Sequence, residues 1–411
     1  MQENILFFYK SSHGELHAGL PILIKILSEK KGLTAYFIYE DEVAFENIPS
    51  FYKQIIEDKF KVIHIGKKNF IPLIRRFISS KNYIMTCDLG HTNYTKILTY
   101  LWPSSRIIFF HHAYALLNGD NYASSKNIIK RLKIEDRFNG IHHDPIVVAH
   151  NHTEVNYREV QGFQSSNIVI AGNLGYQDSW TEKLHDTDKD KELDKLKSTS
   201  KKFEKTIFIP VRGIDDRYLS EDNSTYLLNA LDQIISEFPE YLFLIKTHPR
   251  QNNIKDYLSL ETKHANCQIT RLNTIIVSEI SDLVISYWSS SIIDALAVNT
   301  PVIEFHRHDY HHHQLIKTDK GLVSLYHYMD LCPFYTDYEQ LNDLLTTPIL
   351  WEEIREKQQI VFNSIFLKQY PDFVDNLFNR LENSPQRSDY IKEYLKVPVK
   401  YLYKNLYSKL P

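Results

Sequence analysis

The sequence predicts an α/β protein with two domains, each built around a mostly parallel β-sheet. Short runs of β-branched and aromatic residues alternate with longer helical patterns through the first half of the chain. A highly charged segment, residues 179–205, interrupts this alternation. The alternation then resumes, which gives the chain of 411 residues two sheet-forming regions.

In the first half, the expected strands are short apolar runs bounded by polar residues. In order, they are residues 5–9, 33–39, 61–65, 83–88, 107–114, 145–151 and 167–173. Helical patterns at residues 20–30 and 70–80 lie between them. Strand and helix in this order are typical of βαβ units. We therefore assign residues 1–178 to a first domain, and the charged residues 179–205 to a solvated linker.

The second half repeats this order of elements. Its apolar runs are residues 206–213, 241–250, 275–280, 283–291 and 300–308. Helices are expected from about Ser224 to Phe238 and from the serines near residue 290 to Val298. We assign residues 206–380 to a second domain and residues 381–411 to a C-terminal helical segment.

Composition excludes several classes of protein. The formal net charge of -3 argues against a nucleic-acid partner held by overall basicity. The three cysteines, Cys87, Cys267 and Cys332, are widely spaced and form no CxxC motif, so we expect no disulfide framework, no thiolate zinc site and a reducing, cytoplasmic location. We see no signal peptide and no stretch of 18 apolar residues that would span a bilayer.

The run "LFLIKTHPR" ends a predicted buried strand with three basic side chains. Lys246, His248 and Arg250 would lie at the carboxyl edge of the sheet, where parallel sheets bind ligands. Pro249 restricts the backbone of His248, and a restrained imidazole can donate to a phosphate or a carboxylate. The alternative is a turn whose charged side chains face water.

The next strand runs into a serine turn, Ser289, Ser290 and Ser291, before a helix. Ser291 and Asp294 have the spacing of a capping box, and the hydroxyls with the free amides of the helix start suit a phosphate. Plain N-capping is the alternative. Glu304 would reach the same edge, where a carboxylate can bind the two hydroxyls of a ribose.

Arg212 follows the first strand of the second domain and would lie near the same edge. It would contact a phosphate or, in the alternative, form a salt bridge with Asp215 or Asp216. Together these groups predict a nucleotide site.

The segments "LIKTHPR" and "VISYWSSSIIDALAVNTPVIEF" resemble the nucleotide-binding half of GT-B glycosyltransferases of bacterial capsule, teichoic-acid and lipopolysaccharide assembly. The resemblance covers most of the second half and the first half loosely. It implies two Rossmann-like domains with an interdomain cleft, and a His-Pro pair and serine turn that grip the phosphate of a CMP- or CDP-activated donor. Among these families, the chain looks most like the retaining β-Kdo transferase domains of O-antigen and capsule synthesis.

That resemblance implies a donor, CMP-β-Kdo, and a covalent aspartyl intermediate that gives retention. The nucleophile would map to Asp232, which lies at the margin of the apolar stripe of its helix. A boundary acid facing water is the alternative, and Asp215 and Asp216 are the substitutes. His248, Lys246 or Arg250 would neutralise the departing CMP.

The first domain would bind the glycan acceptor. The loop "KSSHGELHAG" places Ser12, His13 and Glu15 after the first strand, and His13 or Glu15 would be the general base. Other polar groups follow later strands and would bind sugar hydroxyls, with a structural role as the alternative for each. They are Asp88, His91, His111, His112, and His150 with Glu154.

We expect neither a metal nor another cofactor. The histidines of residues 306–313 lack the spacing of zinc ligands, and the acidic "DKD" at residues 188–190 has no strand before it, unlike the metal-binding DxD of a different glycosyltransferase fold. The tyrosines and lysines of the C-terminal segment suit either a helix packed on the domains or peripheral contact with the inner face of the bacterial inner membrane, which a lipid-linked acceptor would favour.

Several alternatives stay open. The rival enzymes are a CDP-glycerol or CDP-ribitol phosphotransferase and a sialyltransferase that uses CMP-sialic acid. A non-catalytic glycan- or nucleotide-binding subunit is the alternative from another class. The sequence does not specify the acceptor, the linkage, the oligomeric state, or whether the chain is one domain of a larger synthase.

Overall fold

The structure of the chain is a computed structural model. It describes residues 2–87, 102, 105–111, 145–160, 163–177, 180–181, 184, 191–212, 220–247, 254–287, 289–306, 316–318 and 321–383. Contacts divide the chain into two compact units. Unit 1 comprises residues 1–112, 122–180 and 368–411, and unit 2 comprises residues 113–121 and 181–367.

Unit 1 contains a seven-stranded sheet of order β3-β2-β1-β4-β5-β6-β7, in which every pair of neighbours is parallel. The strands are β1 Glu3–Tyr9, β2 Thr34–Tyr39, β3 Lys61–His64, β4 Lys81–Thr86, β5 Arg106–Phe110, β6 Ile146–Ala149 and β7 Ile168–Ile170. Each lies within or close to a predicted apolar run. The helices are α1 His13–Glu29, α2 Glu42–Glu46, α3 Ser50–Lys59, α4 Lys67–Phe77, α8 His152–Val160 and α18 Phe373–Asn383, with 3₁₀ turns η2 Ser165–Asn167 and η3 Leu174–Tyr176.

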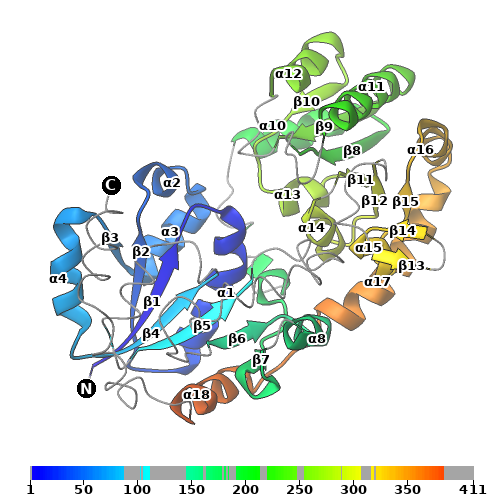
Figure 1. The fold of residues 1–411 in the computed structure, drawn as a ribbon. Helices are drawn as coiled ribbons and strands as arrows, with labels where there is room; N and C mark the ends of the chain where they lie inside the picture. Colours follow the sequence, from blue (N-terminus) through cyan, green and yellow to red (C-terminus); the bar gives the residue numbers. More distant parts are fainter. Residues whose placement is uncertain are drawn as a thin grey trace. The chain divides into compact units, whose positions relative to one another are not determined.

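The core of unit 1 follows from alternation along its strands. Leu6 and Phe8 of β1 pack in one cluster with Leu73 and Phe77 of α4. On the other face, Gly19 brings α1 against Phe7, because a Cβ there would lie 2.4 Å from the Phe7 ring. Figure 1 shows α1 beside the strands of this unit.

Unit 2 contains a six-stranded parallel sheet of order β10-β9-β8-β11-β12-β15 and a small antiparallel pair, β13-β14. The strands are β8 Lys205–Pro210, β9 Tyr241–Lys246, β10 Cys267–Ile269, β11 Leu283–Ser286, β12 Val302–Phe305, β13 Ile316–Thr318, β14 Gly321–Val323 and β15 Phe334–Tyr335. The helices are α10 Lys191–Ser200, α11 Glu221–Glu237, α12 Ile254–Lys263, α13 Thr274–Glu279, α14 Ser291–Ala297, α15 Leu325–Tyr328, α16 Tyr338–Leu345 and α17 Ile349–Phe366.

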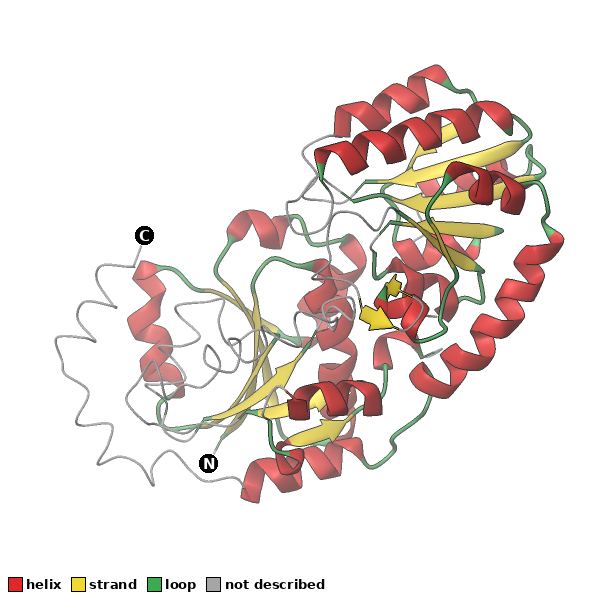
Figure 2. Ribbon diagram, turned by 45° about the vertical axis from the view of Figure 1, so that its right-hand side comes forward, coloured by secondary structure: helices red, strands yellow, loops and turns green. Residues whose placement is uncertain are grey.

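Helices flank the sheet of unit 2, as Figure 2 shows for the red ribbons beside the yellow strands. Ile207 and Ile209 of β8 share a buried cluster with Leu227 and Leu231 of α11, and α13 contacts β8 as well. A parallel sheet with helices packed on it matches the predicted fold class.

Three predicted elements differ from the structure. Residues 275–280 were predicted as a strand, but residues 275–279 belong to helix α13 and Ile280 is its C-cap, since a short apolar run fits either element. Residues 179–205 are not all linker, because α10 lies within them and buries Leu193 and Leu196. Residues 368–380, predicted to close the second domain, belong to unit 1, where Arg106 Nε donates to the carbonyl of Leu381 at 2.9 Å.

Candidate functional site

Three neighbouring strands of unit 2 end in groups that suit a phosphate. Lys246 is the last residue of β9, Arg212 follows β8, and Ser289 follows β11. Pro210 of β8 pairs with Lys246, and the backbone N–H of Val211 donates to the Lys246 carbonyl at 2.9 Å. The parallel register therefore brings Lys246, Arg212 and Ser289 to one carboxyl edge, as predicted.

Lys246 also holds the loop after β10. Its Nζ donates to the carbonyls of Arg271 at 3.2 Å and Leu272 at 2.5 Å. The side chain fastens the loop at the edge of the sheet, a role that the sequence pattern did not predict.

The serine turn differs in detail from the predicted capping box. Ser290, not Ser291, is the N-cap of α14, and its side chain makes no capping bond. Ser289 Oγ accepts from the backbone N–H of Ser291 at 3.3 Å and from its hydroxyl at 2.6 Å. Asp294 instead accepts a hydrogen bond from Thr274 Oγ1 at 2.7 Å, which ties α14 to α13. Ser289 and Ser291 thus form one hydroxyl pair at the edge, while Ser290 is exposed.

Glu304 lies in the core of unit 2 rather than on an accessible edge. Its side chain is 0% exposed, accepts a hydrogen bond from Ser324 Oγ, and lies 3.9 Å from His306 Nε2. Burial raises the pKa of Glu304 to about 7, although hydrogen bonds from Ser324 and Cys332 act in the opposite direction. Alternation explains the placement, because Glu304 points away from the cluster that contains Ile303 and Phe305. This burial disagrees with the predicted contact to a ribose.

Asp232 lies at the other end of the sheet. It is about 16 Å along α11 from the first residue of that helix. Its carboxylate accepts from His264 Nε2 at 2.7 Å and pairs with Lys263 Nζ at 2.6 Å. The His264 bond, with that of Lys263, lowers the pKa of Asp232.

Of the partners of Asp232, Lys263 is the last residue of α12 and His264 follows it, shortly before β10, which places them at the amino ends of the strands. The side chain of nearby Asn266 confirms this, since its Nδ2 donates to the carbonyl of Tyr241, the first residue of β9, at 3.1 Å. The structure therefore does not bring Asp232 together with Lys246 or Ser289. This geometry disagrees with the predicted role of Asp232 as nucleophile.

Several predicted site residues lie outside the described residues. In unit 2 they are Asp215, Asp216, His248, Pro249 and Arg250. In unit 1 they are Asp88, His91 and His112, and the same holds for residues 188–190, 307–313 and 384–411. Their predicted roles stay predictions.

At the carboxyl edge of unit 1, Glu15 is an anchoring group. Ser12 is the N-cap of α1 without a side-chain capping bond, and His13 is its first residue. The Glu15 side chain is buried, and its Oε2 accepts from the backbone N–H of Lys10 at 2.9 Å. Burial raises the pKa of Glu15, while hydrogen bonds from Lys10 and Cys87 act against this shift. The bond to Lys10 ties α1 to the end of β1.

Further along the same edge, a second buried carboxylate holds two basic groups. Glu154 Oε2 lies 2.8 Å from His150 Nδ1, and Glu154 Oε1 accepts from Arg158 Nη2 at 2.9 Å. His111 follows the adjacent strand β5. Arg158 was not predicted, although its spacing of four residues from Glu154 is a signal of a helical ion pair.

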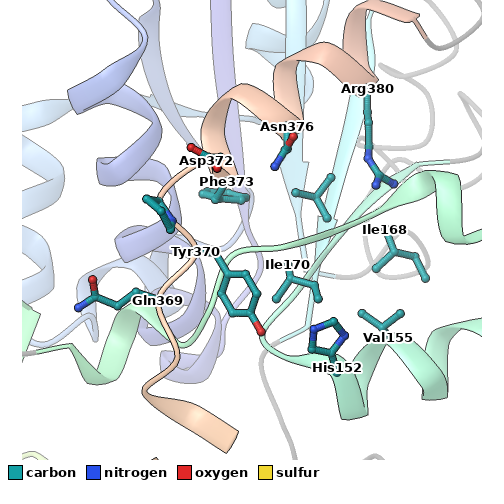
Figure 3. A pocket seen from close by; sticks show the side chains of 12 residues that line it. His152, Val155, Ile168, Ile170, Gln369, Tyr370, Asp372, Phe373, Asn376 and Arg380 are labelled. Carbon is teal, nitrogen blue, oxygen red and sulfur yellow. The ribbon is translucent and has the colours of Figure 1, made fainter. Parts of the chain in front are cut away.

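A cavity of 370 Å³ lies within unit 1 among α8, β7 and the segment that leads into α18 (Figure 3). The rings of His152 and Tyr370 lie edge to face at its wall, with centroids 6.3 Å apart and planes at 61°. Arg380 is held at its side, since Nη1 donates to the carbonyl of Ser165 at 2.8 Å. The sequence pattern did not reveal this cavity, because its walls join segments about 200 residues apart.

No group of histidine, cysteine or acidic residues in the described part of the chain has an arrangement that could hold a metal ion. Among the same residues, no helix is both long and apolar enough to cross a membrane. The three cysteines are buried and form no disulfide.

The two parallel sheets with flanking helices make the chain an α/β protein of the GT-B fold, with two Rossmann-like domains. No protein-family model matches the sequence, and neither does any curated protein. Solved structures do match it over nearly its whole length.

Three of these structures illustrate the likeness. A glycosyltransferase from Rickettsia africae is 16% identical, with a TM-score of 0.52, over 96% of this chain and 99% of that one. UDP-GlcNAc 2-epimerase from Neisseria meningitidis, bound to UDP-GlcNAc, is 13% identical, with a TM-score of 0.56, over 96% and 100%. The wall teichoic acid polymerase TagF, soaked with CDPG, is 12% identical, with a TM-score of 0.57, over 92% and 88%. At this identity, the likeness establishes the fold.

Proposed function

We propose that the chain is a glycosyltransferase that binds a nucleotide-activated sugar at the carboxyl edge of unit 2 and a glycan acceptor at the carboxyl edge of unit 1. The observation that carries this proposal is the placement of Arg212, Lys246 and the Ser289–Ser291 hydroxyl pair at the ends of three adjacent strands. A guanidinium group, an ammonium group and hydroxyls are the donors that a diphosphate or phosphate requires.

Proteins of the same fold support a nucleotide ligand. The epimerase structure contains UDP-GlcNAc, the TagF structure was soaked with CDPG, and the Anabaena protein HepE is in complex with UDP and glucose. Ligands of parallel sheets bind beyond the carboxyl ends of the strands, which is where Arg212 and Lys246 lie.

For the donor we propose CMP-β-Kdo, transferred in O-antigen or capsule synthesis with retention through a covalent aspartyl intermediate. The support is the resemblance of residues 244–250 and 284–305 to β-Kdo transferase domains. We do not assign the nucleophile to Asp232, because its carboxylate is paired at the opposite end of the sheet. Asp215 and Asp216, which follow β8 in the sequence, are the proposed substitutes.

A second candidate is a CDP-glycerol phosphotransferase. The observation that favours it is the fold-level likeness to TagF over both units. Both candidates release CMP, but the phosphotransferase makes a phosphodiester product and the Kdo transferase makes a glycoside without phosphorus.

The test is nucleotide release from a panel of donors: CMP-β-Kdo, CMP-sialic acid, CDP-glycerol and UDP-GlcNAc. The panel is assayed with octyl glycosides as acceptor probes, and the products are analysed by mass spectrometry. We expect release of CMP and a Kdo glycoside. A phosphodiester product would favour the second candidate, a UDP-dependent reaction would refute the cytidine donor, and nucleotide binding without turnover of any donor would indicate a binding subunit.

The site is tested separately by calorimetry with CMP. Replacing Arg212 with alanine removes a charge-assisted contact, so we expect the Kd for CMP to rise about 10- to 100-fold. Arg355→Ala is the matched control, because Arg355 pairs with Glu352 on the surface of α17 in the same unit. Equal Kd values for Arg212→Ala and the control would refute the proposed site.

A further inference from the structure

A short polar segment at the end of β6 and the helix that follows it form a buried ionic cluster in unit 1. The strand ends at Ala149, His150 follows, and α8 begins at His152. Asn151 Oδ1 accepts from the backbone N–H of Glu154 at 3.0 Å and so caps the helix. This cap turns Glu154 of the first helical turn back toward the end of the strand.

Glu154 is bound on both oxygens. Its Oε2 accepts from the backbone N–H of His150 at 2.8 Å and lies 2.8 Å from His150 Nδ1. Its Oε1 accepts from Arg158 at 3.3 Å through Nε and at 2.9 Å through Nη2. The Glu154 side chain is 1% exposed, whereas that of His150 is 13% exposed. The carboxylate is thus enclosed, and the imidazole reaches the surface.

Glu154 is a stable anion in this position. Burial by itself would raise its pKa, but the charge and hydrogen bond of His150 and the charges of Arg158 and His111 outweigh burial and hold the pKa well below its usual range. Arg158 lies over the Phe109 ring at 5.3 Å, which fixes the guanidinium beside the carboxylate. Glu154 therefore accepts hydrogen bonds over the whole neutral range of pH.

An ionised carboxylate at Nδ1 determines the tautomer of the ring. Nδ1 must carry the hydrogen, so the lone pair of the neutral imidazole is on Nε2. Carboxylate–imidazole pairs of this kind hold a general base in the orientation and tautomer that proton transfer requires. His150 also stands at the carboxyl edge, one strand from His111, because Phe110 of β5 pairs with Val148 of β6.

We propose that His150 is the general base of the transfer reaction, and that Glu154 is its positioning residue. This inference rests on the proposed function. His150 Nε2 accepts the proton of the acceptor hydroxyl while that oxygen forms the bond to the anomeric carbon. The bond from that carbon to the leaving carboxylate or nucleotide phosphate breaks, the leaving oxygen keeps the electron pair, and the proton passes from the imidazolium to solvent.

Glu15 is less suited to this role. Its carboxylate is 3% exposed and is occupied by the backbone of Lys10. β1 and β6 are separated by β4 and β5 in the sheet, about 14 Å along the edge. Glu154, by contrast, holds the imidazole of His150, whose side chain is 13% exposed.

The test is steady-state kinetics of nucleotide release, with the donor panel above and octyl glycosides or water as the acceptor. His150→Ala is expected to lower kcat by about 100-fold or more and to leave the Kd for CMP unchanged. Added imidazole is expected to raise the rate of this variant about tenfold, because it replaces the missing base. Glu154→Gln is expected to lower kcat with little change in KM, since the orienting charge is lost.

His152→Ala is the matched control, because His152 is exposed and lies two residues away without contact to Glu154 in the described structure. It should keep the wild-type rate and show no response to imidazole. His150→Gln provides a second variant if His150→Ala does not fold.

His150 variants with a rate within about threefold of the wild type would overturn this inference and leave the proposed function intact. A slow, folded His150→Ala that imidazole does not restore would overturn it as well. A wild type that releases nucleotide from no donor of the panel would overturn both proposals.

Discussion

Replacing Glu304 with glutamine should change how the stability of unit 2 depends on pH. Glu304 is 0% exposed, and the polar groups around it come from several elements. Ser324 and Cys332 donate hydrogen bonds to its carboxyl group, and His306 lies 3.9 Å away. Ser286 of β11 is its paired neighbour in the sheet. A carboxyl group in this setting is costly to ionise.

The magnitude follows from the raised pKa. Burial moves the pKa of Glu304 from its ordinary value of 4.5 to about 7 in the folded chain. At about 1.4 kcal/mol for each pH unit, this difference corresponds to a free energy of the order of 3 kcal/mol. The folded chain holds a proton that the unfolded chain releases, so this contribution is complete below pH 4.5 and is lost as the pH rises through about 7.

The assay is urea unfolding at a series of pH values, followed by hydrogen-exchange mass spectrometry of the peptide that contains β12. This readout reports unit 2 separately from unit 1. Between pH 4.5 and the region above pH 7, the wild type should lose about 3 kcal/mol relative to Glu304→Gln, which has no proton to lose. Glu339→Gln, an exposed change on α16, is the control and should parallel the wild type.

Parallel curves for the wild type and Glu304→Gln would refute the reasoning, because they would mean that Glu304 has the same pKa in the folded and unfolded chains. A stability of the wild type that rises relative to Glu304→Gln over this pH range would refute the sign, since it would require a lowered pKa.

Three further predictions concern packing and pairing. Asp232→Asn should lower the stability of unit 2 by about 1 kcal/mol at neutral pH, after allowance for solvent screening, because it weakens the contacts to His264 and Lys263. Since the pKa of Asp232 is lowered in the folded chain, this difference in stability, measured by urea unfolding, should shrink as the pH falls through that pKa. Intact-mass measurement after incubation with CMP-β-Kdo tests the nucleophile separately. A Kdo adduct on the wild type that is absent from Asp232→Ala would restore the nucleophile role. Gly19→Ala should cost about 1–3 kcal/mol or more in thermal unfolding, because its Cβ would lie 2.4 Å from Phe7 and 2.6 Å from Phe110. A loss no larger than that of Gly66→Ala, where the nearest atom lies 3.7 Å from the added Cβ, would contradict this packing. Asn266→Ala should cost about 1–3 kcal/mol in urea unfolding, because Nδ2 donates to the buried carbonyls of Ile235, Phe238 and Tyr241, and an unchanged midpoint would show that these carbonyls need no donor.

The positions of the strands were predictable because their information is local. Apolar runs bounded by polar residues marked β1, β8, β9 and β11, and the parallel arrangement followed from the helices between them. That arrangement alone puts Arg212 and Lys246 at one edge of a sheet. Helix α13 was missed and residues 275–280 were predicted as a strand. A run of six residues is too short for its hydrophobic periodicity to distinguish a helix from a strand.

The partners of polar side chains were not predictable in the same way. Glu304 is the next-to-last residue of β12 and Lys246 is the last residue of β9. Glu304 is enclosed by Ser324 and Cys332, whereas Lys246 reaches the carbonyls of Arg271 and Leu272. Likewise, the partners of Asp232 come from a segment about thirty residues later in the chain. The position of a residue in a strand or helix fixes its backbone, but the side chain's contacts depend on segments that are distant in the sequence.

The sequence by itself determined two parallel α/β sheets and the edge of each at which polar groups collect, because hydrophobic periodicity and strand order are properties of neighbouring residues. Tertiary structure alone decided which of those groups are buried, which are ionised, and which orient one another. It joined His150 with Glu154 and Arg158 and placed α18 in unit 1. It also put Asp232 at the opposite end of the sheet from the predicted site and buried Glu304. The physical reason is that burial and charge pairing depend on segments that meet only when the chain is folded.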